Sequence, residues 1–131
     1  MILSVITVSN AQTVQDKSFT TIRYIKNDGT IQDNHFVTIG RITDKGTVQD
    51  SKFKTIGLIK EDGTILDRMF RMIGRIKQNG EVLNEKFQII GYLKPDGTVQ
   101  DQQFKSIGYA KGVRMEWVGV SFFFFEVMLK E

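Results

Sequence analysis

The stretch Gly46-Thr-Val-Gln-Asp-Ser-Lys-Phe-Lys-Thr-Ile-Gly-Leu-Ile-Lys-Glu-Asp62 is one copy of a 17-residue repeat that fills most of the 131-residue chain. Each copy carries phenylalanine at its eighth position and isoleucine at its eleventh, and the common first residue is glycine. The copies span residues 12–28, 29–45, 46–62, 63–79, 80–96 and 97–113, and only the first begins with another residue, Gln12. A unit this short cannot bury its own apolar face, so neighbouring units must bury it. The repeat predicts one all-β domain over residues 12–113.

The junctions between copies have the sequence of hairpin turns, since most of them place Asp or Asn directly before the glycine, as in Asp28-Gly29 and Asn79-Gly80. Glycine takes positive φ without steric cost, as a type I turn with a G1 bulge requires. The β-branched runs on either side are expected to pair as strands, which places one aliphatic pair per hairpin on a buried face. The expected pairs are Ile25/Ile31, Ile42/Val48, Ile59/Ile65, Ile76/Val82 and Leu93/Val99.

The segment between these hairpins reads Asp-x-x-Phe-x-x-Ile-Gly. Apolar residues three apart share one side of a single helical or 3₁₀ turn. The Asp or Asn before it, such as Asp33 or Asn84, is a natural cap for that turn. We therefore expect the phenylalanine and the isoleucine of each copy to reach a shared core.

The two ends of the repeat each hold half a hairpin. The strand 13–16 lacks a partner before it, and the strand 107–111 lacks one after it. Pairing these halves would close a ring of six hairpins and remove the exposed sheet edges. The alternative is an open β-solenoid.

Repeats of the form Ile-Gly-x-Ile-Lys-x-Asp-Gly-Thr-Val-Gln-Asp-x-x-Phe resemble those of the bacterial β-flower proteins, in which hairpin petals surround a centre. The closing run from Gly108 to Trp117 and the phenylalanines that follow it are also similar to the end of such proteins. The resemblance implies a ring of β-hairpins with four-fold symmetry and no assigned activity.

The composition narrows the functional classes. The formal charge is +3, because 18 basic residues are offset by 15 acidic ones, and this balance argues against a nucleic-acid-binding protein. The chain has no cysteine and a single histidine, His35, in a variable position of the repeat. No calcium loop, nucleotide-binding loop or nucleophile motif is present. We therefore expect a protein that is not an enzyme and that binds no cofactor or metal.

Residues 1–11 read as a short export signal. Apolar residues 2–8 precede Ser9-Asn10-Ala11, and cleavage after Ala11 would start the mature chain at Gln12. This favours a periplasmic or secreted protein, and the alternatives are a β-strand at residues 2–8 and a cytoplasmic location. No segment is long enough to be a membrane-spanning helix.

Two regions remain as candidate interaction sites. The first is the polar face of the hairpins, where tyrosine and arginine are favoured at interfaces and repetition multiplies weak contacts. Its residues are Tyr24, Lys26, Arg41, Lys60, Arg75, Lys77, Tyr92, Lys94, Tyr109 and Lys111. The second is the apolar segment 114–131, which is expected to form a strand packed on the repeats, or else a docking tail. Its aromatic residues are Trp117, Phe122, Phe123, Phe124 and Phe125.

The favoured function is therefore a non-enzymatic, exported binding or structural module, with a glycan or an envelope protein as a conceivable partner. One alternative is a glycan-active enzyme that uses two carboxyl groups from different repeats. Its candidate acids are Glu61, Glu81, Glu85, Glu116 and Glu126. Another alternative is a protein that forms oligomers through the aromatic tail.

Overall fold

The fold of the repeats is a closed barrel of twelve antiparallel strands, seen in a computed structural model that describes residues 11–130. The strands are β1 (Ala11–Asp16), β2 (Thr21–Lys26), β3 (Thr30–Asp33), β4 (Thr38–Ile42), β5 (Thr47–Asp50), β6 (Thr55–Ile59), β7 (Thr64–Asp67), β8 (Met72–Ile76), β9 (Glu81–Asn84), β10 (Ile89–Leu93), β11 (Thr98–Asp101) and β12 (Ser106–Tyr109). The first and last strands pair through Gln15–Tyr109 and Asp16–Gly108. The predicted ring closure is confirmed, and the open solenoid is wrong.

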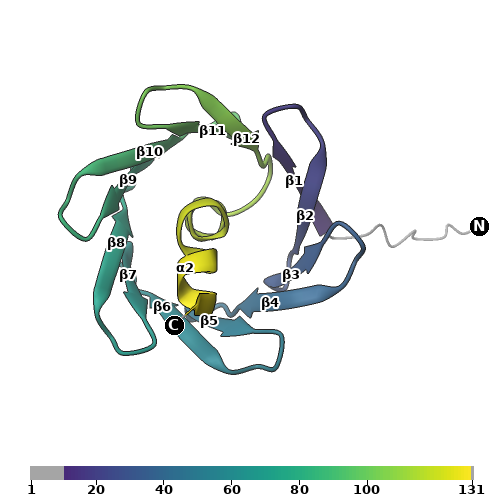
Figure 1. The fold of residues 1–131 in the computed structure, drawn as a ribbon, viewed down its shortest axis with the longest axis vertical. Helices are drawn as coiled ribbons and strands as arrows, with labels where there is room; N and C mark the ends of the chain where they lie inside the picture. The colour runs from purple at the N-terminus through teal and green to yellow at the C-terminus, as the bar shows by residue number, and fades with distance from the viewer. Residues whose placement is uncertain (1–10, 131) are drawn as a thin grey trace, which may run out of the picture.

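Two kinds of turn alternate around the barrel. We call 27–29, 43–46, 60–63, 77–80 and 94–97 the Gly turns, and 17–20, 34–37, 51–54, 68–71, 85–88 and 102–105 the Phe turns. Successive turns of an up-and-down barrel lie at opposite ends, so the barrel has a Gly end and a Phe end. The hairpins that carry the Phe turns form petals around a central helix (Figure 1).

The predicted register of the Gly-turn hairpins is confirmed. Ile25 lies opposite Ile31, and the other four aliphatic pairs are matched in the same way. All ten of these side chains are buried. Strand side chains alternate between faces, so the residues on either side of each pair lie on the outside of the barrel.

The expected role of the phenylalanines is wrong. The Asp-x-x-Phe segment is a tight hairpin turn rather than a helical turn between hairpins, because the N–H of each phenylalanine donates to the carbonyl of the Asp or Asn three residues earlier. This reversal places the phenylalanine at a petal tip, far from the core. The isoleucine three residues later behaves as expected in most copies: Ile56 is buried, and Ile39, Ile73, Ile90 and Ile107 pack against the core.

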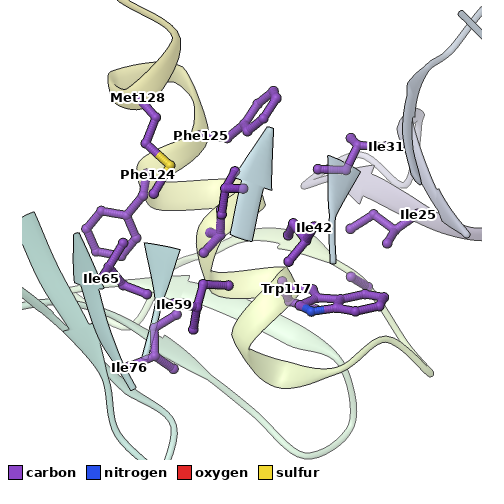
Figure 2. Close-up of a cluster of buried hydrophobic side chains, with 14 of the residues drawn as sticks. Ile25, Ile31, Ile42, Ile59, Ile65, Ile76, Trp117, Phe124, Phe125 and Met128 are labelled. Atoms are coloured by element: carbon purple, nitrogen blue, oxygen red, sulfur yellow. The ribbon is translucent and has the colours of Figure 1, made fainter. Parts of the chain in front are cut away.

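The apolar C-terminal segment lies inside the ring and is a helix, not the expected strand. It comprises α1 (Met115–Gly119), a π-helical turn η1 (Val120–Phe124) and α2 (Phe125–Lys130). Every strand of the closed barrel already pairs on both sides, so a central segment finds no free strand edge. Its buried backbone groups must be satisfied within the segment, which a helix achieves. Figure 2 shows Trp117, Phe124, Phe125 and Met128 among the strand isoleucines.

The helix fits the barrel through a second glycine series. A Cβ built on each of these glycines would overlap a side chain of the central helix, so their missing side chains make room for its rings. The matched pairs are Gly108 with Phe122, Gly91 with Phe123, Gly74 with Phe124, Gly57 with Met128 and Gly40 with Phe125.

The first copy of the repeat has Arg23 where the other copies have these glycines. Its guanidinium donates to the carbonyl oxygen of Ser121 at 2.7 Å and to the Glu126 carboxylate at 2.6 Å. It also lies over the ring of Phe125, 5.7 Å from the ring centroid. Arg23 therefore sets the rotation of the helix within the ring.

The helix runs from the Gly end to the Phe end. Near its start, Met115 and Trp117 lie beside Gly-turn residues, and near its end the carbonyl oxygen of Met128 accepts from Arg68 of a Phe turn at 3.2 Å. Within residues 11–130, no helix is long and apolar enough to cross a membrane. The predicted export signal falls on residues 1–10, outside the described residues, and on Ala11, the first residue of β1.

Candidate functional site

The residues predicted as one polar binding surface lie in two places. The tyrosines and arginines of the series (Tyr24, Arg41, Arg75, Tyr92 and Tyr109) are half-buried on the outer face of the strands. The lysines are at the Gly end, where Lys26 is half-buried and Lys60, Lys77, Lys94 and Lys111 are exposed. The middle of each strand therefore presents the aromatic and guanidinium groups, and the Gly turns present the ammonium groups.

The tips of the petals carry a feature that the sequence reading missed. Phe19, Phe36, Phe53, Phe70, Phe87 and Phe104 are each 62–76% exposed. All six have φ between 62° and 66°, in the left-handed region. This conformation costs a residue with a side chain about 1–2 kcal/mol, and glycine avoids the cost. A large apolar residue thus recurs at a position that neither burial nor backbone preference favours.

The Gly turns show the contrast. Gly29 and its four equivalents also have positive φ. At Gly29, Gly46, Gly63 and Gly80 a Cβ would overlap a backbone carbonyl of the adjacent strand, and at Gly97 it would lie 2.9 Å from Cα of Lys111. Glycine at that end is a steric requirement of the barrel. No similar requirement explains phenylalanine at the Phe end.

Three of the six phenylalanines stack on a tyrosine of the neighbouring petal. The ring centroids lie 4.3 Å apart for Phe19 and Tyr109, and 4.7 Å apart both for Phe36 and Tyr24 and for Phe104 and Tyr92. At the equivalent positions, Phe53, Phe70 and Phe87 have Arg41, Leu58 and Arg75 as their counterparts. Since all six phenylalanines remain largely exposed, stacking accounts for only part of the conserved pattern among the copies.

The aspartates that precede the Phe turns cap these turns: their side chains accept hydrogen bonds from backbone N–H groups of the turn. Oδ1 of Asp33 accepts from the N–H groups of His35 at 2.8 Å and Val37 at 3.0 Å. The bonds from Val37 and then from His35 lower the pKa of Asp33, and the equivalent bonds lower that of Asp50. Asn84 makes the same two contacts in its own turn.

Asp67 is the buried member of this series. Burial acts most strongly on its pKa, in the upward direction, but the N–H groups of Arg71 and Met69 and the Arg71 side chain together lower it. The guanidinium Nε of Arg71 lies 2.8 Å from the second carboxylate oxygen. The carboxylates of Asp33, Asp50 and Asp67 thus serve as ionised turn caps.

The acids of the enzyme alternative are distributed over several parts of the structure. Glu81 pairs with Lys77, and Glu126 with Arg23. Glu61 and Glu116 line a groove of about 550 Å³ at the Gly end, together with Asp62. The N–H and hydroxyl of Thr64 lower the pKa of Asp62, so it is poorly suited to act as a general acid. Within residues 11–130, no group of three or more potential metal ligands is present.

The predicted interaction tail is part of the core. Trp117, Phe124 and Phe125 are buried, and Phe122 and Phe123 are half-buried and packed against the core cluster. These aromatic side chains fill the interior of the barrel. In this structure they therefore offer no surface for docking or for oligomer formation.

The exposed phenylalanines could have been found from the sequence. Two β-branched runs separated by four residues indicate a hairpin, and the third residue of these loops, the phenylalanine, takes the left-handed position that glycine holds in many hairpins. The i, i+3 spacing of Phe and Ile also fits a helical turn, so this spacing alone does not distinguish the two kinds of turn.

A family model described as "5-fold beta-flower protein" matches residues 10–126. The match supports the β-flower resemblance and corrects the expected four-fold symmetry, and the barrel itself has six Phe-turn hairpins within residues 11–130. No curated protein and no solved structure matches the chain.

Proposed function

Since this chain belongs to the 5-fold beta-flower protein family, whose description states no activity, we propose that it is a non-enzymatic binding module that engages its partner through the Phe end. The observation that carries the proposal is the set of six exposed phenylalanines in the left-handed conformation. Backbone strain that recurs at exposed side chains is typical of binding sites.

The repeat makes this site multivalent. Six tips on one rigid ring present the same aromatic group, so several weak contacts can combine without a deep pocket. The helix of the chain itself fills the interior of the barrel. The petal tips at the Phe end therefore form the most apolar part of the exposed surface.

The test is a screen of the intact protein against glycan, polyanion and lipid arrays, repeated with Phe53→Asn/Phe70→Asn/Phe87→Asn. Asparagine tolerates positive φ, and none of these three rings stacks on a tyrosine at its equivalent position, so the variant is expected to remain folded. We expect it to lose the retention that the unchanged protein shows. A matched variant at the Gly end, Lys60→Gln/Lys94→Gln/Lys111→Gln, should retain its ligand. Equal retention by both variants would refute a site at the Phe end.

We also propose that the protein is exported and that cleavage follows Ala11. The sequence of residues 1–11 supports this. N-terminal sequencing of the protein recovered from its native host should give Gln12 as the first residue. A mature chain that still begins with Met1 would contradict export by this signal.

A further inference from the structure

The exposed apolar surface is confined to one end of the barrel. Ile22 and Ile89 lie where β2 and β10 leave their Phe turns, and Val127 and Leu129 lie on α2, whose end contacts the Phe turn of Arg68. Every large apolar side chain exposed within residues 12–130 belongs to this end: Phe19, Ile22, Phe36, Val37, Phe53, Met69, Phe70, Phe87, Ile89, Phe104, Val127 and Leu129. The Gly end contributes none in that range.

The two ends also differ in charge. The Phe turns carry seven basic residues against one acid, Glu85, and all but one of the seven are exposed. The basic residues are Lys17, Lys52, Lys54, Arg68, Arg71, Lys86 and Lys105. At the Gly end the charges are nearly balanced. The acids Asp28, Asp44, Glu61, Asp62 and Asp96 face the lysines Lys26, Lys45, Lys60, Lys77, Lys94 and Lys111.

The acidic caps at the base of the Phe turns weaken this positive field but do not sit at the tips. Asp16, Asp33, Asp50 and Asp101 are half-buried, and Asp67 is buried. Each accepts two backbone N–H groups of its own turn. The outermost groups at this end are therefore phenylalanine rings and basic side chains.

We infer that the Phe end docks on a phospholipid bilayer that carries anionic headgroups, an inference that rests on the proposed function. Aromatic side chains enter the boundary between headgroups and acyl chains, while lysine and arginine attract anionic lipids. The surface of a bilayer is flat on the scale of this barrel, so several petals can contact it at once. A folded protein partner would need a surface that matches the shape of the Phe end. The binding is peripheral.

The feature common to the Phe turns favours a lipid surface over a glycan. Five of the six turns pair phenylalanine with at least one lysine or arginine, and the exception is 34–37, which holds His35. Stacked aromatic platforms of the kind that a sugar ring could use occur at only three petals. The combination that recurs around the barrel is therefore a phenylalanine beside a basic side chain.

The experiment is co-sedimentation of the full chain with phosphatidylcholine vesicles, with and without phosphatidylglycerol, at low and high ionic strength. We expect binding that requires phosphatidylglycerol and weakens with salt. Phe53→Asn/Phe70→Asn/Phe87→Asn should weaken binding about tenfold or more. Lys52→Gln/Lys54→Gln/Lys105→Gln should remove the preference for phosphatidylglycerol. The Gly-end variant Lys60→Gln/Lys94→Gln/Lys111→Gln should bind like the unchanged protein, and a melting curve for each variant reports its folding.

Three results would overturn the inference. The unchanged protein could fail to bind anionic vesicles at low salt, the phenylalanine variant could bind them equally well, or the Gly-end variant could lose as much binding as the Phe-end variants. If the unchanged protein does not bind vesicles but binds a glycan or protein ligand that the phenylalanine variant no longer binds, the lipid inference fails and the proposed function stands. If the phenylalanine variant keeps every ligand, both fail.

Discussion

The phenylalanines at the petal tips show a conflict between local preference and the residue present. A hairpin turn with one position in the left-handed region favours glycine or asparagine at that position, and the chain uses glycine there in the turns at its other end. Under the proposed function, such an exposed phenylalanine side chain contacts a ligand outside the chain. The effect of each phenylalanine on the free energy of unfolding and on binding can be measured with single substitutions, one petal at a time.

Replacing Phe53 with glycine should stabilise the fold by about 1 kcal/mol, because the left-handed conformation no longer carries a Cβ. Phe36→Gly should give a smaller gain or none, since it also removes the stack on Tyr24, worth about 0.5–1.5 kcal/mol. Urea unfolding of the two variants measures the difference. A loss of stability in Phe53→Gly would mean that its ring makes a stabilising contact with the neighbouring petal.

Asp33→Asn/Asp50→Asn should flatten the dependence of stability on acid pH. The pKa values of both carboxyls are lowered in the folded state, so their ionisation stabilises the fold above the ordinary aspartate pKa, and this contribution disappears as the pH falls through the folded values. Asparagine keeps the two N–H acceptor contacts, as Asn84 does, but does not titrate. Urea midpoints at neutral pH and below pH 4 test this, and an unchanged acid slope would contradict it.

The central helix is the element on which sequence and structure differ most. Its run of four phenylalanines, with valines nearby, favours a strand by propensity. Propensity is overridden because the closed barrel leaves no strand to pair with. The π-helical turn has more residues per turn than an α-helix, so Phe122, Phe123 and Phe124 are separated by smaller rotations and face successive petals.

Gly91→Ala should destabilise the protein by about 1–3 kcal/mol, because the added Cβ would overlap the ring of Phe123 and crowd the carbonyl oxygen of Gln100. The second variant Gly91→Ala/Phe123→Leu should recover part of the loss by shortening the helix side chain. Denaturant unfolding of both single variants and the double variant gives the coupling between petal and helix. Strict additivity would show that the ring does not limit the space at Gly91.

At the level of the whole molecule, closure and filling depend on each other. The closed ring surrounds the helix, and the aromatic rings of the helix share one core cluster with the strand isoleucines and valines. The seam between β1 and β12 joins the two ends of the repeat and completes the rim that carries the six phenylalanines.

A chain ending at Val113 should therefore lose cooperative unfolding, since the aliphatic pairs would face an empty centre. We expect exposed apolar surface and loss of the near-ultraviolet circular dichroism signal with part of the strand signal retained. Thermal unfolding and binding of a hydrophobic dye measure this. A truncated chain that unfolds as sharply as the full one would mean that the ring is stable without its helix.

The hairpin register, the aliphatic pairs, the turn caps and the ring closure follow from the sequence, because the 17-residue period and the Gly turns define which residues oppose each other. The helix and the positions of the phenylalanines do not. A run of phenylalanines is equally apolar in a strand or a helix, and the available hydrogen-bond partners decide between them only once the barrel has closed. Likewise, Phe36 and Ile39 have the same spacing in either kind of turn, and the chain reversal at the petal tip sends one outward and the other toward the core.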